Sequence, residues 1–186
     1  MGRYMIHLKN SGYTPRDAAH LLSRSRELTS EMDAEIRDAR ISSRYLELDV
    51  SVDEDELPQF VNRLDPIGPL DHSQHIVEEQ IEKPEAIEKG RFFFNHERYW
   101  ECHEVLEGVW KKSSESEKDL LQGIILVAAA LVHYQKNEKT ICLSILRRAL
   151  EKLTNATGKY YNIDIDIFRT KVSQTLKSGL IETFTI

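Results

Sequence analysis

A stripe of polar and aromatic side chains near the middle of the chain has the residue types and spacing of a chemical site. In a helix capped by Asn95 and ending near Lys112, one face carries His96, Trp100, His103, Glu107 and Trp110. So wide an aromatic face should be buried, and burying imidazole and carboxylate groups without partners is costly. We therefore expect a neighbouring helix or a metal ion to satisfy them.

One interpretation is a metal site. His103 and Glu107 are four residues apart, so their side chains project from adjacent turns and can share a proton or an ion. With His133 from a facing helix they make a two-histidine, one-carboxylate set suited to zinc, manganese or iron, and Glu104 would act as general base. The pattern is not the HExxH signature, because Glu107 stands where the second histidine is required.

The alternative is a buried hydrogen-bond network without metal. In it Glu107 accepts from the indole N–H of Trp110 or Trp100, or orients His103, and the network fixes the register of the helices. We favour this alternative, because satisfied polar groups in protein cores outnumber metal ligands.

The next helical pattern, Lys118 to Gln135, is expected to pack against this helix. Its polar stripe holds Gln122 and His133, which lie about 16 Å apart at 1.5 Å per residue. Gly123 is expected to let a partner helix approach closely, and Gly108 to do the same in the first helix.

Together these two segments resemble the helical family catalogued as domain of unknown function 309. The family pattern joins a phenylalanine-asparagine start and an HExLExxW helix to a QGxxxxAxAxxH helix. In this chain it falls on Phe94, Asn95, Trp100, His103, Glu104, Leu106, Glu107, Trp110, Gln122, Gly123, Ala128 and His133. The resemblance covers about residues 85–153 and implies a compact helical fold without an assigned activity. The amino-terminal half lies outside it.

That first half has a different periodicity. Strict alternation over residues 45–52 predicts a strand with Tyr45, Glu47, Asp49 and Ser51 on its polar side. Further strands are predicted over residues 4–8, 36–41 and 70–77, and helices over 14–28 and 53–64. The resulting β-α-β-β-α-β order is typical of the ferredoxin-like motif.

We therefore predict an α+β protein of two domains. The first, residues 1–77, is a ferredoxin-like module, and a charged linker follows at 78–84. The second, residues 85–186, is an all-α bundle with helices over 84–94, 95–112, 118–135, 138–153 and 164–177, the last ending at Gly179.

Composition narrows the classes of function. Residues 1–83 hold 10 basic and 17 acidic side chains and residues 84–186 hold 15 and 14, without a basic cluster, so we expect no nucleic-acid partner. No apolar run is long enough for a membrane span, and no secretory signal is recognisable. Cys102 and Cys142 form no CxxC pair, which indicates reduced core thiols and a cytoplasmic location.

Three functions are compatible with these sequence patterns. The leading hypothesis is a non-catalytic binding or regulatory module, homo-oligomeric, that takes a small-molecule or protein ligand. The first alternative is a metal-dependent hydrolase that uses His103, Glu107 and His133. The second is a helical scaffold that binds a partner protein.

Overall fold

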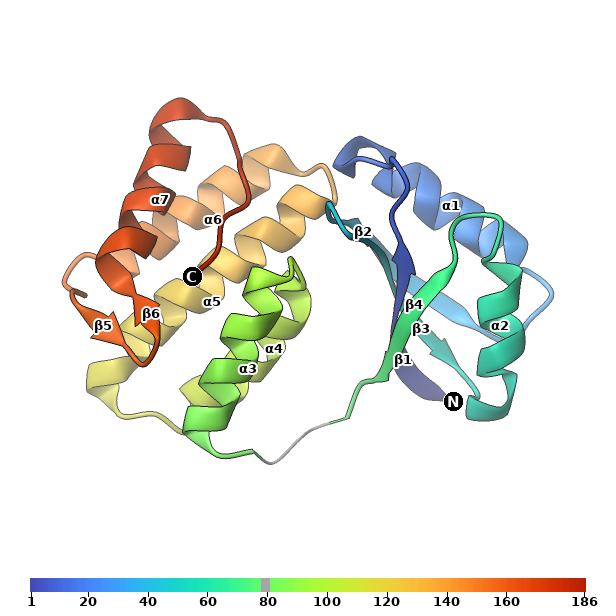
Figure 1. Ribbon diagram of the computed structural model, residues 1–186, viewed down its shortest axis with the longest axis horizontal. Coiled ribbons are helices and arrows are strands. Elements are labelled where there is room, and N and C mark those ends of the chain that lie inside the picture. The colour runs from blue at the N-terminus through green and yellow to red at the C-terminus, as the bar shows by residue number, and fades with distance from the viewer. Residues whose placement is uncertain (78–80) are drawn as a thin grey trace. The chain divides into compact units, whose positions relative to one another are not determined.

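The alternating segments of the first half form a four-stranded antiparallel sheet (Figure 1). The computed structural model describes residues 1–77 and 81–186. Its first elements are β1 (Gly2–Lys9), α1 (Ala18–Leu28), β2 (Glu35–Ile41), β3 (Tyr45–Val52), α2 (Leu57–Arg63) and β4 (Leu70–His75). The sheet order is β2-β3-β1-β4, and every neighbouring pair is antiparallel. The predicted order of these elements along the chain is confirmed.

One face of this sheet carries the apolar core of the first half. Cross-strand partners Ile6 and Leu48, and Leu8 and Leu46, are fully buried in one cluster with Phe60 of α2 and residues of α1. Successive side chains of a strand point to opposite faces, so the polar residues of β3 lie on the other face of the sheet.

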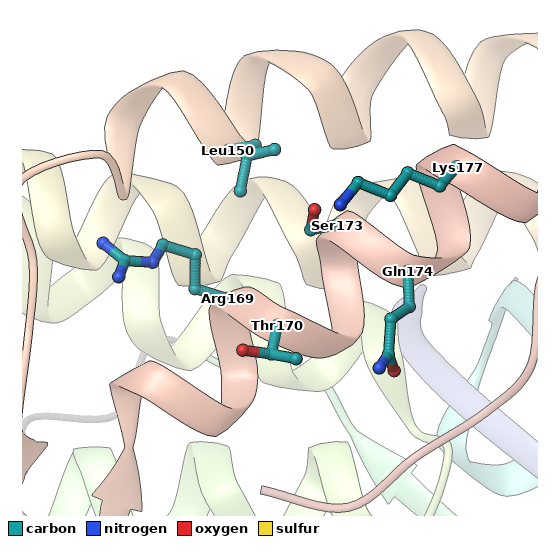
Figure 2. Close-up of a pocket in the computed structure, with 6 residues that line it drawn as sticks. All are labelled: Leu150, Arg169, Thr170, Ser173, Gln174 and Lys177. Atoms are coloured by element: carbon teal, nitrogen blue, oxygen red, sulfur yellow. The ribbon is translucent and has the colours of Figure 1, made fainter.

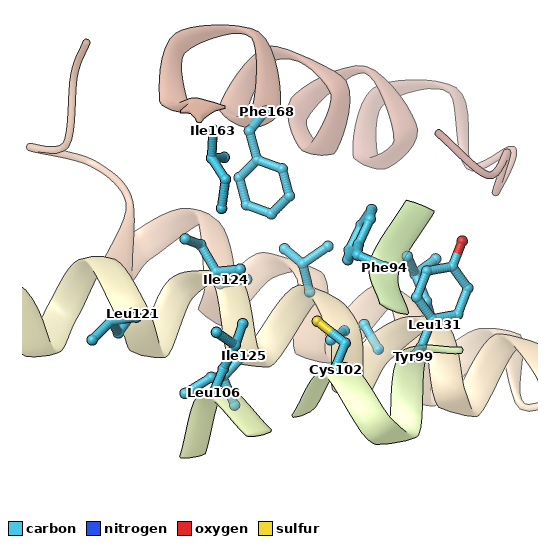
Figure 3. Packing of buried hydrophobic residues seen from close by; sticks show 14 of the residues in the cluster. Phe94, Tyr99, Cys102, Leu106, Leu121, Ile124, Ile125, Leu131, Ile163 and Phe168 are labelled. Atoms are coloured by element: carbon cyan, nitrogen blue, oxygen red, sulfur yellow. The ribbon is translucent and has the colours of Figure 1, made fainter. Parts of the chain in front are cut away.

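Helices build the second half of the chain. They are α3 (Lys83–Asn95), α4 (Tyr99–Lys111), α5 (Glu115–Gln135), α6 (Lys139–Lys152) and α7 (Ile165–Ser178). Figure 3 shows their shared core, where Phe94, Tyr99 and Phe168 meet aliphatic side chains of α4 and α5. α7 ends at Gly179 with φ 66°, as predicted, and is preceded by the hairpin β5 (Lys159–Tyr160) and β6 (Ile163–Asp164), which the sequence did not predict.

The helix predicted over residues 95–112 is interrupted at its start. α3 continues through Asn95, and α4 begins only at Tyr99. Between them Glu97 adopts the left-handed conformation with φ 59°. The prediction that Asn95 caps α4 is therefore wrong, since that position belongs to Arg98, and the polar stripe does not run on one continuous helix.

Glycines mark two close helix contacts. A Cβ at Gly123 would lie 2.6 Å from the Cγ and Cδ2 atoms of Leu153, at the end of α6, so the predicted close approach is confirmed. Gly108 is exposed with nothing within 4 Å of its Cβ position, so the same prediction for Gly108 is wrong. The corresponding contact of α4 is instead at Gly90 of α3, where a Cβ would lie 2.8 Å from Leu106.

The described residues divide into two units, one of residues 1–77 and 135–137 and the other of residues 81–134 and 138–186. We call them the sheet unit and the helical unit. Of the predicted linker, residues 78–80 lie outside the described residues, whereas Lys83 and Pro84 already belong to α3. Within residues 1–77 and 81–186, no helix has the length and apolar character needed to cross a membrane.

Candidate functional site on the helical unit

Three side chains of metal-binding types gather on α4. The ligand atoms of His103, Glu104 and Glu107 all lie within 4.8 Å of one another. The Nδ1 atom of His103 is 3.2 Å from a carboxylate oxygen of Glu104 and 4.0 Å from one of Glu107, and Lys111 Nζ lies 3.6 Å from the Glu107 carboxylate. The predicted proximity of His103 and Glu107 is therefore found, with Glu104 beside them.

We expected this cluster to be buried, but it is partly exposed. The side chains of His103 and Glu107 retain 29% and 38% of their exposure. The core face of α4 consists of Tyr99, Cys102, Leu106 and Val109, which repeat at three- and four-residue intervals. His103 and Glu107 each follow a core position by one residue, which turns them toward the edge of the helix.

His133 lies apart from this cluster. Its Nδ1 atom pairs with the carboxylate of Glu138, at the turn between α5 and α6. The metal set of His103, Glu107 and His133 requires these three side chains to lie together. The structure does not bring His133 to the other two. Gln122 is half-buried on α5 and makes no side-chain hydrogen bond to any residue of the described ranges.

The tryptophans of α4 are both half-buried. Trp110 packs against the core of the helical unit, with Lys118 Nζ 5.7 Å from its ring centroid. Its indole N–H is buried and has no acceptor in the described part of the chain, so Glu107 does not accept from it, which was one of the three roles that the network hypothesis offered for Glu107. Trp100 lies at the start of α4 and makes a polar or ring contact of its own.

A buried ion pair at the start of α4 was not predicted. The guanidinium of Arg98 donates to both carboxylate oxygens of Glu101, and it also lies 4.5 Å above the ring of Phe93. Both charged residues are almost fully buried. Their three-residue spacing is the only sequence signal that could have indicated them.

Neither cysteine has the properties of a nucleophile. Cys102 and Cys142 are buried free thiols, as predicted. Burial raises the pKa of both, that of Cys142 to about 12, which keeps them protonated and unreactive.

Asn95 has a partner far away in the sequence. Its side-chain N–H donates to the backbone carbonyl of Ile186 at 3.0 Å, and its side-chain oxygen accepts from the backbone N–H of Ile186 at 2.7 Å. Two residues earlier, Phe184 packs at centroid distances of 5.4 Å from Phe94 and 5.9 Å from Phe168. We call the surface formed by Phe94, Asn95 and Phe168 the tail site, and residues 180–186 the tail.

The sequence pattern of a family described as a domain of unknown function, DUF309, matches residues 87–145. The chain belongs to the DUF309 family. A conserved hypothetical protein from Thermus thermophilus, of known structure, is 32% identical, with 48% of this chain and 94% of that chain covered and a TM-score of 0.43. No curated protein matches the chain.

The DUF309 match contains the cluster on α4 and two of the three residues of the tail site. Asn95, His103 and Glu107 lie inside it, whereas Phe168 and the tail lie beyond its end at residue 145. The family pattern therefore supplies one wall of the tail site, and later parts of this chain supply the rest.

A second charged group occupies the polar face of the sheet unit. Glu47 of β3 accepts from the guanidinium of Arg40, and its other carboxylate oxygen lies 3.2 Å from Nε2 of His7. The rings of His7 and His72 stack at 4.2 Å. Although burial acts to raise it, Arg40 and His7 hold the pKa of Glu47 well below its usual range. The alternation of β3 predicted the face of Glu47 but not its partners.

Proposed function

We propose that this protein is a non-catalytic binding module whose helical unit binds an extended polypeptide segment at the tail site. The observation that carries this proposal is the double hydrogen bond between the Asn95 side chain and the backbone of Ile186. A side-chain amide that offers one donor and one acceptor to a single residue imitates a neighbouring β-strand. It recognises the backbone of the bound residue and not its side chain.

Side-chain selectivity would come from the aromatic part of the site. In the tail Phe184 and Ile186 are half-buried, whereas Thr185 between them is exposed. This alternation is that of an extended chain with one face on a surface. The site therefore suits a partner polypeptide that carries an aromatic residue two positions before an aliphatic one, with the tail as its occupant within this chain.

The test uses the full-length chain and a fluorescent peptide with the sequence of residues 180–186. Phe184→Ala removes the aromatic anchor of the resident tail, so this variant should bind the peptide saturably, and more tightly than the unmodified protein does. In the unmodified protein the tethered tail competes at an effective concentration on the order of millimolar. Thr185→Ala is the matched control, because Thr185 is exposed in the same segment, and it should behave as the unmodified protein.

Two results decide whether the tail site binds an extended polypeptide. Adding Asn95→Ala to Phe184→Ala should weaken peptide binding by roughly tenfold, as expected for about 1.4 kcal/mol of lost hydrogen bonding. If folded Phe184→Ala protein, verified by circular dichroism, leaves the peptide unbound at millimolar concentration, the tail site is only a packing contact and the proposal fails.

A second candidate, metal-dependent hydrolysis, is favoured by the cluster of His103, Glu104 and Glu107. Imidazole and carboxylate ligands suit zinc or manganese, and the partial exposure of the cluster would leave coordination positions for water. Metal content measured on untagged protein should be near one equivalent and should disappear in His103→Ala and Glu107→Gln. His133→Ala is the control that should keep the metal. Metal-free unmodified protein after incubation with zinc and manganese would exclude this function.

For the sheet unit we propose a ferredoxin-like module. Its element order, its antiparallel sheet with β1 and β3 at the centre, and the packing of both helices on one face support this assignment.

A further inference from the structure

A surface pocket of about 350 Å³ lies between α6 and α7 and shares no residue with the cluster on α4 or with the tail site (Figure 2). The residues that line it are Leu150 of α6 and Arg169, Thr170, Ser173, Gln174 and Lys177 of α7. Arg169, Ser173 and Lys177 follow one another at four-residue intervals and so form one stripe of α7. The pocket thus has one apolar wall and one wall of hydrogen-bond donors.

The charge of this lining is positive. It contains a guanidinium, an ammonium, two hydroxyls and a side-chain amide, and no carboxylate. Asp166 approaches Arg169 from outside the lining, with 3.7 Å between Oδ1 and Nη2. Hydrogen-bond donors and cations around a recess favour an anion with several acceptor oxygens.

Arg169 is held in place by the end of α6. Its Nη1 atom donates to the carbonyl oxygens of Leu153, Thr154 and Ala156 at 3.4, 3.0 and 3.1 Å. Cations stabilise the C-terminal end of a helix in this way, so Arg169 has a structural role in addition to its place in the pocket.

Lys177 is the cation available to a ligand. Its ammonium group has no ion-pair or hydrogen-bond partner within residues 81–186, and neither does the hydroxyl of Ser173 one turn earlier. Figure 2 shows the Lys177 side chain extended along α7 toward Ser173. A single oxyanion could therefore contact both groups.

We propose that this pocket binds the phosphate group of a small organic molecule. Lys177 and Ser173 bind the phosphate oxygens, and Leu150 contacts the organic part. The volume supports a ligand larger than the bare ion, because small-molecule sites begin at about 300 Å³.

The test is a titration of ¹⁵N-labelled full-length protein with inorganic phosphate and with glycerol phosphate, followed by amide chemical shifts at constant ionic strength. Saturable shifts should appear at residues 173–177, and Lys177→Gln should weaken binding at least tenfold. Lys171→Gln is the matched control, because Lys171 is an exposed lysine of α7 that does not line the pocket. It should leave the affinity unchanged.

The two ligands separate the sources of phosphate. Tighter binding of glycerol phosphate supports an organic phosphate that uses Leu150, and that preference should fall in Leu150→Ala. Equal affinity for the two ligands would overturn the organic ligand and leave a site for the free ion. Chemical shifts that do not saturate, or an equal loss of phosphate affinity in Lys177→Gln and Lys171→Gln, would overturn the phosphate site. Neither result would bear on peptide binding at the tail site.

Discussion

Replacing two helix glycines by alanine should change the stability of the helical unit to different extents. Gly108 and Gly123 both lie inside helices, so each substitution gains about 1 kcal/mol of helix propensity. They differ in their surroundings. The new methyl group meets open space at Gly108, but at Gly123 it would lie 2.6 Å from two carbons of Leu153, a fully buried residue.

The magnitude follows from this difference. Contacts below 3 Å with a buried side chain force a backbone or rotamer shift, and overpacking of this kind costs about 1 to 3 kcal/mol. Gly108→Ala should therefore be about 1 kcal/mol more stable than the unmodified protein, and Gly123→Ala should lie about 1 to 3 kcal/mol below Gly108→Ala. Because the propensity gain is common to both variants, the difference between them isolates the packing cost.

Tryptophan fluorescence during urea unfolding is a suitable assay. Both tryptophans of the chain, Trp100 and Trp110, lie in α4, so the signal reports on the helical unit rather than on the sheet unit. In thermal unfolding the same difference corresponds to roughly 2 to 4 °C per kcal/mol for a chain of this size. Equal stabilisation by the two substitutions would refute the close contact of α5 with Leu153.

Two further predictions concern charged side chains. Since the folded-state pKa of Glu47 is depressed, its contribution to stability is present above its unfolded value near 4.5 and is lost as the pH falls toward about 2. Glu47→Gln should lower the stability of the sheet unit at neutral pH and make it decline less as the pH falls. Hydrogen exchange of the β1 and β3 amides measures this stability. An unchanged pH dependence would contradict the stabilising role of the ionised Glu47 carboxylate. Asp164 accepts from the backbone N–H of Ile167 at 3.0 Å as the N-cap of α7, so Asp164→Ala should cost about 0.5 to 2 kcal/mol. Asp164→Asn, which keeps an oxygen acceptor at the same N-cap, is the comparison that should cost less in the same urea titration.

The fold could be predicted in segments where buried side chains recur at the regular spacing of a strand or a helix. The alternation of residues 45–52 became β3 with the predicted bounds, because one face of the sheet is apolar along its whole length. The hairpin of β5 and β6 was missed because strands of two residues are too short to show alternation. The break between α3 and α4 was predicted, but the start of α4 was placed at residue 95 instead of Tyr99, because Glu97 is a common helix residue and nothing in its side chain indicates a left-handed backbone.

The candidate site could be predicted only where its residues share a helix. The i,i+4 spacing brought His103 and Glu107 together, since that contact needs no tertiary structure. His133 was placed beside them by assuming how α4 and α5 face one another, and periodicity on one helix does not fix that orientation. The pair of Asn95 and Ile186 joins residues 91 positions apart, for which no local pattern exists.

The break at Glu97 connects these observations. A continuous helix from α3 into α4 would carry Asn95 as an interior residue of a longer stripe, with no end of a helix at which to meet an extended chain. By ending α3 at Asn95 and restarting at Tyr99, the backbone leaves the Asn95 amide free to pair with the tail and sets Arg98 against Glu101 at the start of α4. The left-handed residue costs on the order of 1 kcal/mol, which the paired amide and the buried ion pair must offset. The position that departs from regular structure is thus the one that builds the proposed binding site, as expected where function and local propensity conflict.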